Sequence, residues 1–282
     1  MGTSVPYAKS PQKTTFNTGG DVSKTFDALI KAEAESKSKS QKRVKRSEVR
    51  FNALSVFKDK ARPIKIDFDL DPYIEEQYHR LRRHLLPNAK RAAIKVVMVA
   101  ATDHGEGGTT TAAILASTLA RSGNTKILLV DANLRTPALD EVFEPGQGSK
   151  LLGLSDRVLS EAALDQTIYQ TDIPNLFFMP CGKAVSSPSY MFDSEPINAM
   201  VSALREKFDF VIFDGSPLRD YSESCFLAGQ MDGVILVVEA ERTKAEVVRK
   251  IRKDLEATGV NILGVVLNKK KNYIPEYLER FL

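Results

Sequence analysis

Apolar residues fall into short, nearly continuous runs through the second two thirds of the chain. These runs occupy residues 93–101, 126–132, 175–180, 208–214, 233–240 and 261–268. Segments with apolar residues at helical spacing separate them, at 109–123, 196–208, near 222–230 and at 244–259. Buried strands alternating with amphipathic helices predict a three-layer α/β fold, with a mainly parallel sheet covered by helices on both faces.

The first part of the chain follows a different pattern. Residues 1–60 are poor in apolar residues, and we expect them to be a largely disordered extension with one short helix at 23–35. Residues 61–91 form a linker that ends in a second helix at 71–88, whose apolar positions repeat at helical spacing. The predicted globular domain therefore spans residues 92–282.

Charge is distributed unevenly between these regions. The whole chain carries +4, but residues 1–60 hold 13 Lys/Arg against 6 Asp/Glu. Residues 36–50 alone hold seven basic residues and one acid. Such a segment is either a solvated linker or a basic patch for an anionic membrane surface, where each charge contributes on the order of 1 kcal/mol.

Other compositional features exclude several classes of protein. No apolar run approaches the ~18 residues of a membrane-spanning helix, and the first residues lack the apolar core of a secretory signal. Cys181 and Cys225 are far apart and match no metal-binding or redox spacing. We therefore expect a reduced, cytoplasmic protein.

A glycine-rich turn connects the first apolar run to the following helix. It contains Gly105, Glu106, Gly107, Gly108, Thr109 and Thr110. Glycines let backbone N–H groups turn toward an anion, and the positive end of the helix dipole points at the same place. The turn is therefore either a phosphate-binding loop or simply a tight turn, and the sequence around it favours the first.

Acidic and amide side chains end three other apolar runs. Asp131, Asp214 and Asn268 each stand at the carboxyl end of a predicted strand, where ligands bind in parallel α/β sheets. One such aspartate is often only a helix cap. Two of them beside a phosphate loop, together with Thr109, predict a Mg²⁺ site, in which water completes the coordination.

From residue 70 onward, the chain resembles the cytoplasmic bacterial tyrosine kinases (BY-kinases) of capsule and exopolysaccharide synthesis, a branch of the P-loop NTPases. Its glycine-rich turn is similar to their Walker A loop, GEGK[ST][ST]. The run from Asp131 to Arg135 matches their Walker A′ motif DxDxR, and the run from Asp214 to Pro217 matches their Walker B motif DxxP. Asn268 resembles the element that reads the nucleotide base.

The resemblance carries further implications for partners. Glu76, His79 and Arg82 occupy the positions of an ExxRxxR motif that the family uses for self-assembly. The soluble type of BY-kinase pairs with a polysaccharide co-polymerase in the membrane, so the resemblance implies such a partner and a location at the inner face of the plasma membrane. It also implies binding of ATP or ADP with Mg²⁺.

The chain departs from the family pattern at functional positions. Gly108 replaces the lysine that contacts the terminal phosphates, Asn133 replaces the second Walker A′ acid, and His79 replaces an arginine of the assembly motif. The family's C-terminal tyrosine cluster is reduced to Tyr273 and Tyr277, which pack in a C-terminal turn or accept phosphate.

The missing lysine has a large expected cost. A hydrogen bond to a charged group contributes on the order of 1.5–3 kcal/mol, and loss of a preorganised transition-state donor costs roughly 10²–10³ in rate. Backbone amides, Thr109 and Mg²⁺ remain, so weak nucleotide binding can survive while efficient phosphotransfer cannot.

Three functional hypotheses follow from these patterns. The first is a pseudokinase that regulates exopolysaccharide polymerisation or export, with Asp131, Asn133 and Asp214 at an impaired catalytic centre. The second is an active tyrosine autokinase that uses ATP, Mg²⁺ and a substitute cation. The third is a partitioning-type ATPase that binds DNA or membrane through residues 36–50. We rank the third lowest, and we do not expect nucleic acid as a partner.

Overall fold

The structure is a computed structural model that describes residues 65–66, 72–85, 94–139, 143–144, 151–160, 162–185, 188–192, 195–221 and 223–270. The expected helix at 23–35, the basic segment 36–50, and Tyr273 and Tyr277 lie outside the described residues. The proposed boundaries at residues 60 and 91 also fall outside them.

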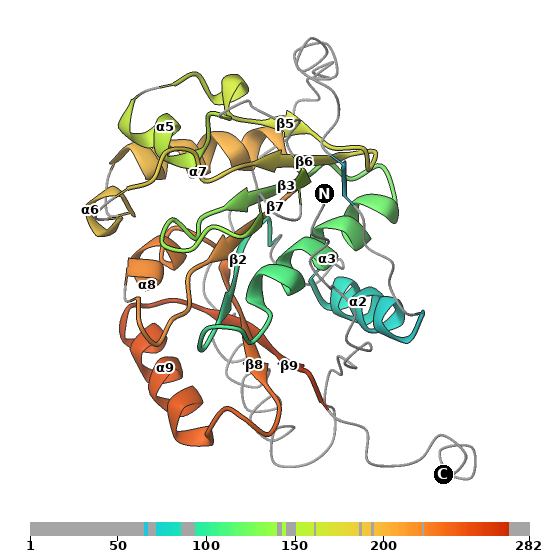
Figure 1. The fold of residues 1–282 in the computed structure, drawn as a ribbon, viewed down its shortest axis with the longest axis vertical. Coiled ribbons are helices and arrows are strands. Elements are labelled where there is room, and N and C mark those ends of the chain that lie inside the picture. The colour runs from blue at the N-terminus through green and yellow to red at the C-terminus, as the bar shows by residue number, and fades with distance from the viewer. Residues whose placement is uncertain are drawn as a thin grey trace, which may run out of the picture.

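A seven-stranded sheet forms the centre of the protein (Figure 1). Its strand order is β5-β6-β3-β7-β2-β8-β9. The strands are β2 (Val96–Ala101), β3 (Ile127–Asp131), β5 (Tyr169–Gln170), β6 (Leu176–Met179), β7 (Phe210–Gly215), β8 (Gly233–Glu239) and β9 (Ile262–Asn268). All neighbours pair in parallel except β5, a two-residue edge strand that runs antiparallel to β6. The predicted mainly parallel α/β fold is confirmed.

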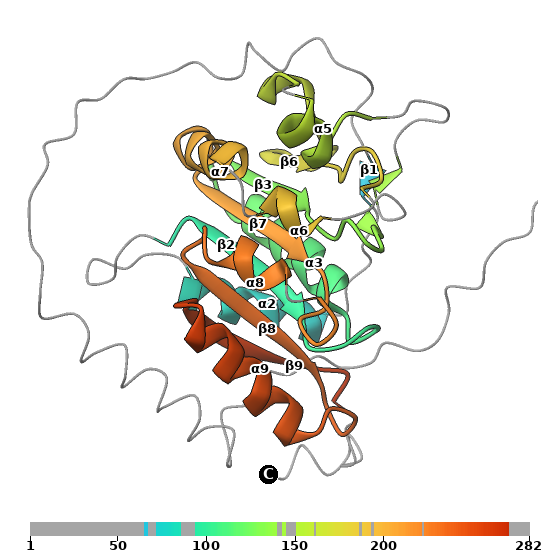
Figure 2. The same cartoon turned by 90° about the vertical axis from the view of Figure 1, so that its left-hand side faces the viewer.

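Helices cover both faces of this sheet (Figures 1 and 2). On one face lie α2 (Pro72–Leu85) and α3 (Gly108–Arg121), and on the other lie α7 (Glu195–Lys207), α8 (Glu223–Ala228) and α9 (Ala245–Ala257). Shorter elements that the apolar pattern does not predict are α5 (Leu154–Leu159), the 3₁₀ turn η2 (Leu164–Gln166), α6 (Ser189–Phe192) and a pairing of β1 (Lys65–Ile66) with β4 (Phe143–Glu144). Among the described residues, no helix combines the length and apolar character needed to cross a bilayer.

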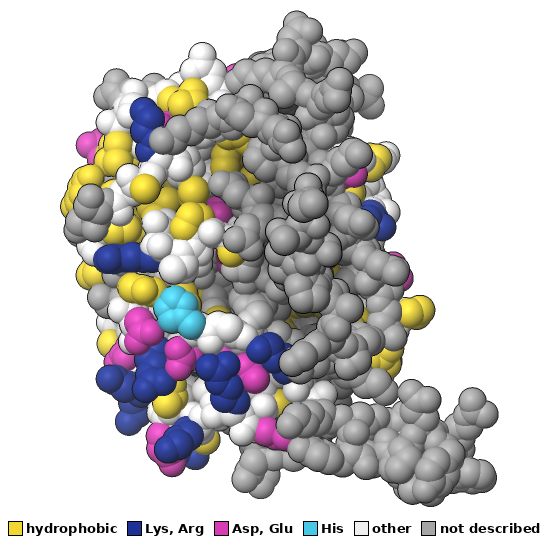
Figure 3. All heavy atoms as spheres, in the orientation of Figure 1, with side chains coloured by type: hydrophobic (Ala, Val, Ile, Leu, Met, Phe, Trp, Pro, Cys, Tyr) yellow, Lys and Arg dark blue, Asp and Glu magenta, His cyan; other side chains and the backbone are white. Residues whose placement is uncertain are grey.

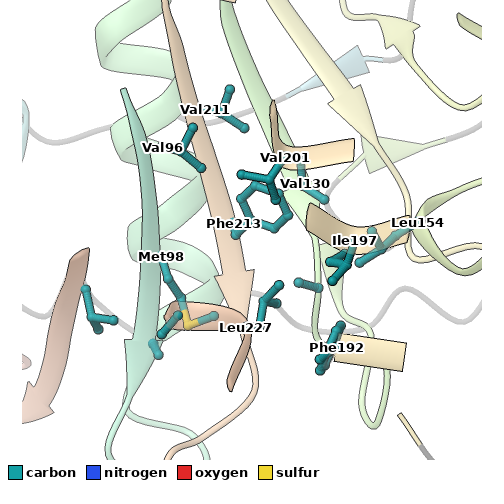
Figure 4. Close-up of a cluster of buried hydrophobic side chains, with 14 of the residues drawn as sticks. Val96, Met98, Val130, Leu154, Phe192, Ile197, Val201, Val211, Phe213 and Leu227 are labelled. Carbon is teal, nitrogen blue, oxygen red and sulfur yellow. The ribbon is translucent and has the colours of Figure 1, made fainter. Parts of the chain in front are cut away.

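The apolar core divides into two halves because side chains alternate along each strand. In β2, Met98 faces the cluster under α7 and α8, while Val97 and Val99 face α3. Figure 4 shows the first half, in which Met98 and Phe213 from the sheet meet Val201 and Leu227 from the helices. Both faces of the strands are therefore buried, which explains their continuous apolar sequence.

The strand order brings the carboxyl ends of β3, β7, β2, β8 and β9 to one edge of the sheet. Asp131 and Asp214 are direct neighbours in the register of β3 and β7. Paired residues of parallel strands point to the same face, here the face covered by α3. The glycine-rich turn, which joins β2 to α3, lies at this same edge.

Helix α2 is fixed to α3 by a buried tyrosine. The Tyr78 side chain is 1% exposed and packs in the apolar cluster of α3. Burial raises the pKa of Tyr78 to about 12, and a hydrogen bond with the Thr111 side chain offsets part of that rise. Arg82 from the same helix donates through Nη2 to the Ser122 carbonyl at the end of α3 (3.3 Å). These contacts hold α2 along the helix that begins at the glycine-rich turn.

Truncation of Tyr78 should therefore destabilise the protein strongly. We expect Tyr78→Ala to lower the free energy of unfolding by about 3–5 kcal/mol, as for other buried aromatic side chains. Tyr73→Ala on the same helix is the matched control, because Tyr73 is 43% exposed. Urea unfolding of both variants measures the difference, and equal losses would contradict this packing.

Candidate nucleotide-binding site

Two glycines shape the turn between β2 and α3. Gly105 and Gly107 have φ angles of 75° and 92°, in the left-handed region where a side chain is strained. Helix α3 begins directly after them, at Gly108. The turn therefore directs backbone N–H groups and the N-terminus of a 14-residue helix toward the edge of the sheet, which is the arrangement that binds phosphate.

A buried carboxylate holds this turn from inside. The Glu106 side chain is 1% exposed, and its Oε2 atom accepts hydrogen bonds from the Thr102 backbone N–H (2.9 Å), the Thr102 hydroxyl (2.5 Å) and the Asp103 backbone N–H (3.0 Å). The Thr243 hydroxyl, from the loop before α9, donates to the other oxygen, Oε1. The Glu106 side chain thus joins the two ends of the turn, and Thr243 connects the turn to the end of β8.

The ends of β8 and β9 hold the turn from outside. Asn268 donates through Nδ2 to the Glu106 carbonyl (2.8 Å), so this amide supports the turn itself. Lys269 donates through Nζ to the Gly105 carbonyl (2.5 Å) and to Glu239 Oε2 (3.0 Å). Burial would raise the pKa of Glu239, but hydrogen bonds from Lys269 and Arg242 bring it below its usual value.

The first residue of α3 is packed closely against the end of β2. A Cβ atom added to Gly108 would lie 3.2 Å from both the Cβ and the backbone nitrogen of Ala101. This distance is tighter than nine in ten real Cβ contacts, so β2 would have to move by a few tenths of an ångström. The position that resembles the family's lysine is therefore fitted closely around glycine.

The two predicted acids meet at the sheet edge beside α3. Asp131 and Asp214 are both fully buried, and Asp131 Oδ1 accepts the Asn133 backbone N–H (3.0 Å). Burial raises the pKa of Asp214 from 3.8 to about 7, and the Thr109 side chain offsets part of that rise. Neither oxygen of Asp214 accepts a hydrogen bond of ordinary geometry from the described residues. Such a carboxylate is suited to bind a cation.

Asn133 organises the segment after β3. Its Oδ1 atom accepts hydrogen bonds from the Ser216 hydroxyl (2.9 Å), the Thr136 backbone N–H (3.2 Å) and the Thr136 hydroxyl (3.3 Å). The side chain is 6% exposed. Asn133 therefore ties the end of β3 to the end of β7, a role that a carboxylate could fill with the same three donors.

The segment after β7 crosses the start of the glycine-rich turn. Leu218 and Arg219 donate through their backbone N–H groups to the carbonyls of Ala101 (3.0 Å) and Thr102 (3.1 Å). Arg135 lies over the ring of Tyr221, with 5.2 Å from the guanidinium carbon to the ring centroid. His104 contacts the same ring edge-on, with 5.6 Å between ring centroids. Sequence patterns did not reveal Tyr221 or Thr243.

The residues predicted for assembly lie on α2, which packs against α3. Glu76 forms ion pairs within its own helix, with Arg80 at 3.2 Å and Arg83 at 3.6 Å. His79 lies 3.7 Å from Glu75, and Arg82 contacts the end of α3 as described above. The structure therefore shows contacts within one chain for all three predicted positions.

The arrangement fits a nucleoside phosphate with Mg²⁺. The turn offers backbone N–H groups, Asp131 and Asp214 offer carboxylates, and the nearby Thr109 offers a hydroxyl. No group of three or more His, Cys, Asp or Glu residues in the described part of the chain could hold a metal ion. A metal here would therefore depend on Thr109, water and the phosphates for its remaining ligands.

The fold and this edge of the sheet define a P-loop NTPase. A family model described as an AAA domain matches residues 94–261. The chain is 30% identical over 203 residues to the tyrosine-protein kinase CpsD of Streptococcus agalactiae, a match that covers 72% of this chain and 85% of that protein. It is also 28% identical over 196 residues to the tyrosine-protein kinase YwqD of Bacillus subtilis, covering 70% and 81%.

A solved structure supports the same assignment. The crystal structure of the chimerical protein CapA2B2 superposes with a TM-score of 0.66 at 26% identity, and the match covers 74% of this chain and 94% of that one. The chain therefore belongs to the AAA domain family and, within it, to the bacterial tyrosine kinase family. This confirms the resemblance and the fold class that the sequence predicted.

The raised pKa of Asp214 predicts a pH-dependent stability. The folded chain holds this proton more tightly than the unfolded chain, so the stability it contributes is present below about pH 4 and is lost as the pH rises to about 7. We expect Asp214→Asn to raise the melting temperature relative to wild type, by an amount that grows across this range and then levels off.

Asp254→Asn, on the exposed side of α9, is the matched control, because it makes the same substitution away from the buried pair. Thermal melts without nucleotide between pH 4 and pH 9 measure both variants. A gain for Asp214→Asn that is the same at every pH would show that the Asp214 carboxyl is not perturbed by burial.

Proposed function

We propose that this protein is a nucleotide-binding pseudokinase that regulates exopolysaccharide polymerisation or export, together with a co-polymerase in the membrane. In this role the P-loop domain binds ATP or ADP with Mg²⁺ weakly and transfers phosphate poorly or not at all. Its output is its conformation and its contacts with the partner, at the inner face of the plasma membrane.

One observation carries this proposal. The site keeps a glycine-rich turn, two buried carboxylates and Thr109, but glycine occupies the position that corresponds to the family's lysine. The close packing of Gly108 against Ala101 supports a site adjusted to this residue. Losing the lysine removes charge stabilisation that phosphoryl transfer needs most in its transition state.

The substitution at Asn133 supports the proposal further. A lysine-to-glycine change removes one positive charge, and an aspartate-to-asparagine change removes one negative charge. Asp131 and Asp214 already place two carboxylates side by side at this edge of the sheet. A third acid without the lysine would increase their repulsion, so a neutral Asn133 keeps the site ordered.

The partner is inferred from family membership. BY-kinases of the soluble type pair with a co-polymerase in the membrane, and the chain matches such proteins over most of its length. Self-association through Glu76, His79 and Arg82 is part of the same proposal, although these side chains already have contacts within the chain. The basic segment 36–50 would add attraction to anionic lipid.

An active tyrosine autokinase is the second candidate, because the relatives are named tyrosine-protein kinases. In that case Tyr273 or Tyr277 accepts the phosphate. A positively charged group from elsewhere than position 108 stabilises the transition state. Mapping of phosphopeptides after incubation with Mg-ATP distinguishes this candidate from a pseudokinase.

Restoring both charged residues tests the proposal directly. We expect wild type to show no autophosphorylation or ATP hydrolysis above background, and Gly108→Lys combined with Asn133→Asp to gain roughly 10²-fold or more, the size of one lost donor. Radiolabelled ATP measures both activities in the full-length protein.

Gly108→Ala combined with Asn133→Asp is the matched control, because it adds the Cβ atom and the carboxylate without the ammonium group. It should remain inactive. Wild-type transfer of phosphate to its own tyrosines at ordinary kinase rates would overturn the pseudokinase proposal, and an inactive but folded Lys/Asp variant would place the defect elsewhere.

The basic segment gives a separate prediction about membranes. Replacing the seven basic residues of 36–50 with Gln should abolish binding to vesicles that contain phosphatidylserine, since each charge contributes on the order of 1 kcal/mol. Vesicle sedimentation at two salt concentrations measures this loss. Equal binding of the two proteins would assign the segment to a solvated linker, and salt-sensitive binding to duplex DNA would favour the partitioning-type alternative.

A further inference from the structure

Two strained residues follow the strands that flank the glycine-rich turn. Glu241, after β8, and Lys269, after β9, have φ angles of 64° and 55°. A residue with a side chain in the left-handed region costs about 1 kcal/mol or more, and such strain clusters at functional sites. In this chain, residues at or beside these positions bond to the turn.

The side chains delivered by these loops contact the turn at three points. Lys269 bonds to the Gly105 carbonyl, Asn268 bonds to the Glu106 carbonyl, and Thr243 bonds to the Glu106 carboxylate. We call these three residues the outer clamp. Carbonyl groups held from outside leave the N–H groups of the same turn available to an anion on the inner side.

Charged side chains of both signs surround the clamp. Glu106 and Glu239 carry two negative charges, and Arg242 and Lys269 carry two positive charges. Glu239 Oε2 accepts from Arg242 (2.9 Å) and from Lys269 (3.0 Å), and Arg242 is near enough to Glu106 to interact with it electrostatically. Figure 3 shows charged side chains of both signs side by side over the lower part of the face it presents.

The nearby cations matter because Glu106 places a negative charge inside a turn that must accept phosphate. Without a lysine at position 108, the turn itself holds no cation to offset that charge. Among the described residues, Lys269 is the basic side chain whose ammonium group is shown bonded to the backbone of residues 105–109.

We propose that Lys269 is a positioning residue for the diphosphate of a bound nucleotide. It holds residues 105–109 in the anion-binding conformation and offsets the charge of Glu106, and so supplies from β9 part of the ordering that a lysine in the turn would supply. It acts through the turn and does not itself touch the reacting atoms. The inference rests on the proposed function only in requiring that the site bind a nucleotide.

Two measurements on the full-length protein test this role. Amide hydrogen exchange without nucleotide reports the conformation of the turn through its hydrogen-bonded amides, Asp103, which donates to the Glu106 carboxylate, and Thr111, which donates to the Gly107 carbonyl. We expect Lys269→Ala to speed exchange at these two residues by about tenfold or more, the factor for a lost charged hydrogen bond. Calorimetric titration with Mg-ADP should show a loss of affinity of similar size.

Lys270→Ala is the matched control, because the neighbouring Lys270 is exposed and the same charge is removed from the chain. It should behave as wild type in both measurements. Thr243→Val is a second variant that removes another contact of the clamp, and it should also speed exchange in the turn.

The outcomes separate this inference from the proposed function. Unchanged exchange in both Lys269→Ala and Thr243→Val would overturn the clamp, whether or not the protein transfers phosphate. Faster exchange in both, with Lys270→Ala unchanged, supports the clamp even in a protein that proves to be an active kinase. Equal losses of Mg-ADP affinity in Lys269→Ala and Lys270→Ala would show that Lys269 acts only through the net charge of the chain. That result would also overturn the proposal.

Discussion

The buried carboxylate of Glu106 is the contact on which the rest of the site depends. An ionised group in an apolar interior is costly unless nearly all of its hydrogen-bonding capacity is used. Here three donors from Thr102 and Asp103 occupy one oxygen, and Thr243 serves the other. The same carboxylate therefore fixes the curvature of the turn and connects it to β8, so the turn is ordered before any ligand binds. The negative charge that provides this order opposes phosphate binding, which is why the surrounding cations matter.

At the ends of β3 and β7, two buried carboxylates lie side by side, and few hydrogen-bond donors compensate their charge. Asp131 and Asp214 are neighbours in register, and burial raises the pKa of Asp214 to about 7. Protonation of Asp214 relieves the repulsion between the two carboxylates when no metal is bound, whereas the ionised pair is suited to Mg²⁺. A neutral Asn133 fits this balance, because its carbonyl oxygen already accepts three protein donors and adds no further charge. At the ends of β3 and β7, the site is kept ordered by limiting the number of negative charges. At the turn, it is kept ordered by hydrogen bonds to the charge of Glu106.

The sequence predicted those features that depend on periodicity and on the ends of strands. Continuous apolar runs located the main strands, since both faces of a covered parallel sheet are buried, and Asp131 and Asp214 were placed together because parallel strands end at one edge. Contacts that depend on side-chain direction were not predictable, such as the bond from the Asn268 amide to the Glu106 carbonyl and the contact of the Arg82 guanidinium with the end of α3. The roles expected of these residues in base reading and assembly stay predictions. The short α5 and α6 have too few residues to show a helical period.

Packing around Gly108 limits which side chains this position of the turn can hold. A Cβ atom at this position would lie 3.2 Å from the Cβ and the backbone nitrogen of Ala101. Ala101 ends β2, which pairs with both β7 and β8, the strands that carry Asp214 and Glu239. Interiors packed this densely respond to changes of even one methyl group. A side chain introduced at position 108 must therefore be accommodated by the end of β2 as well as by the turn.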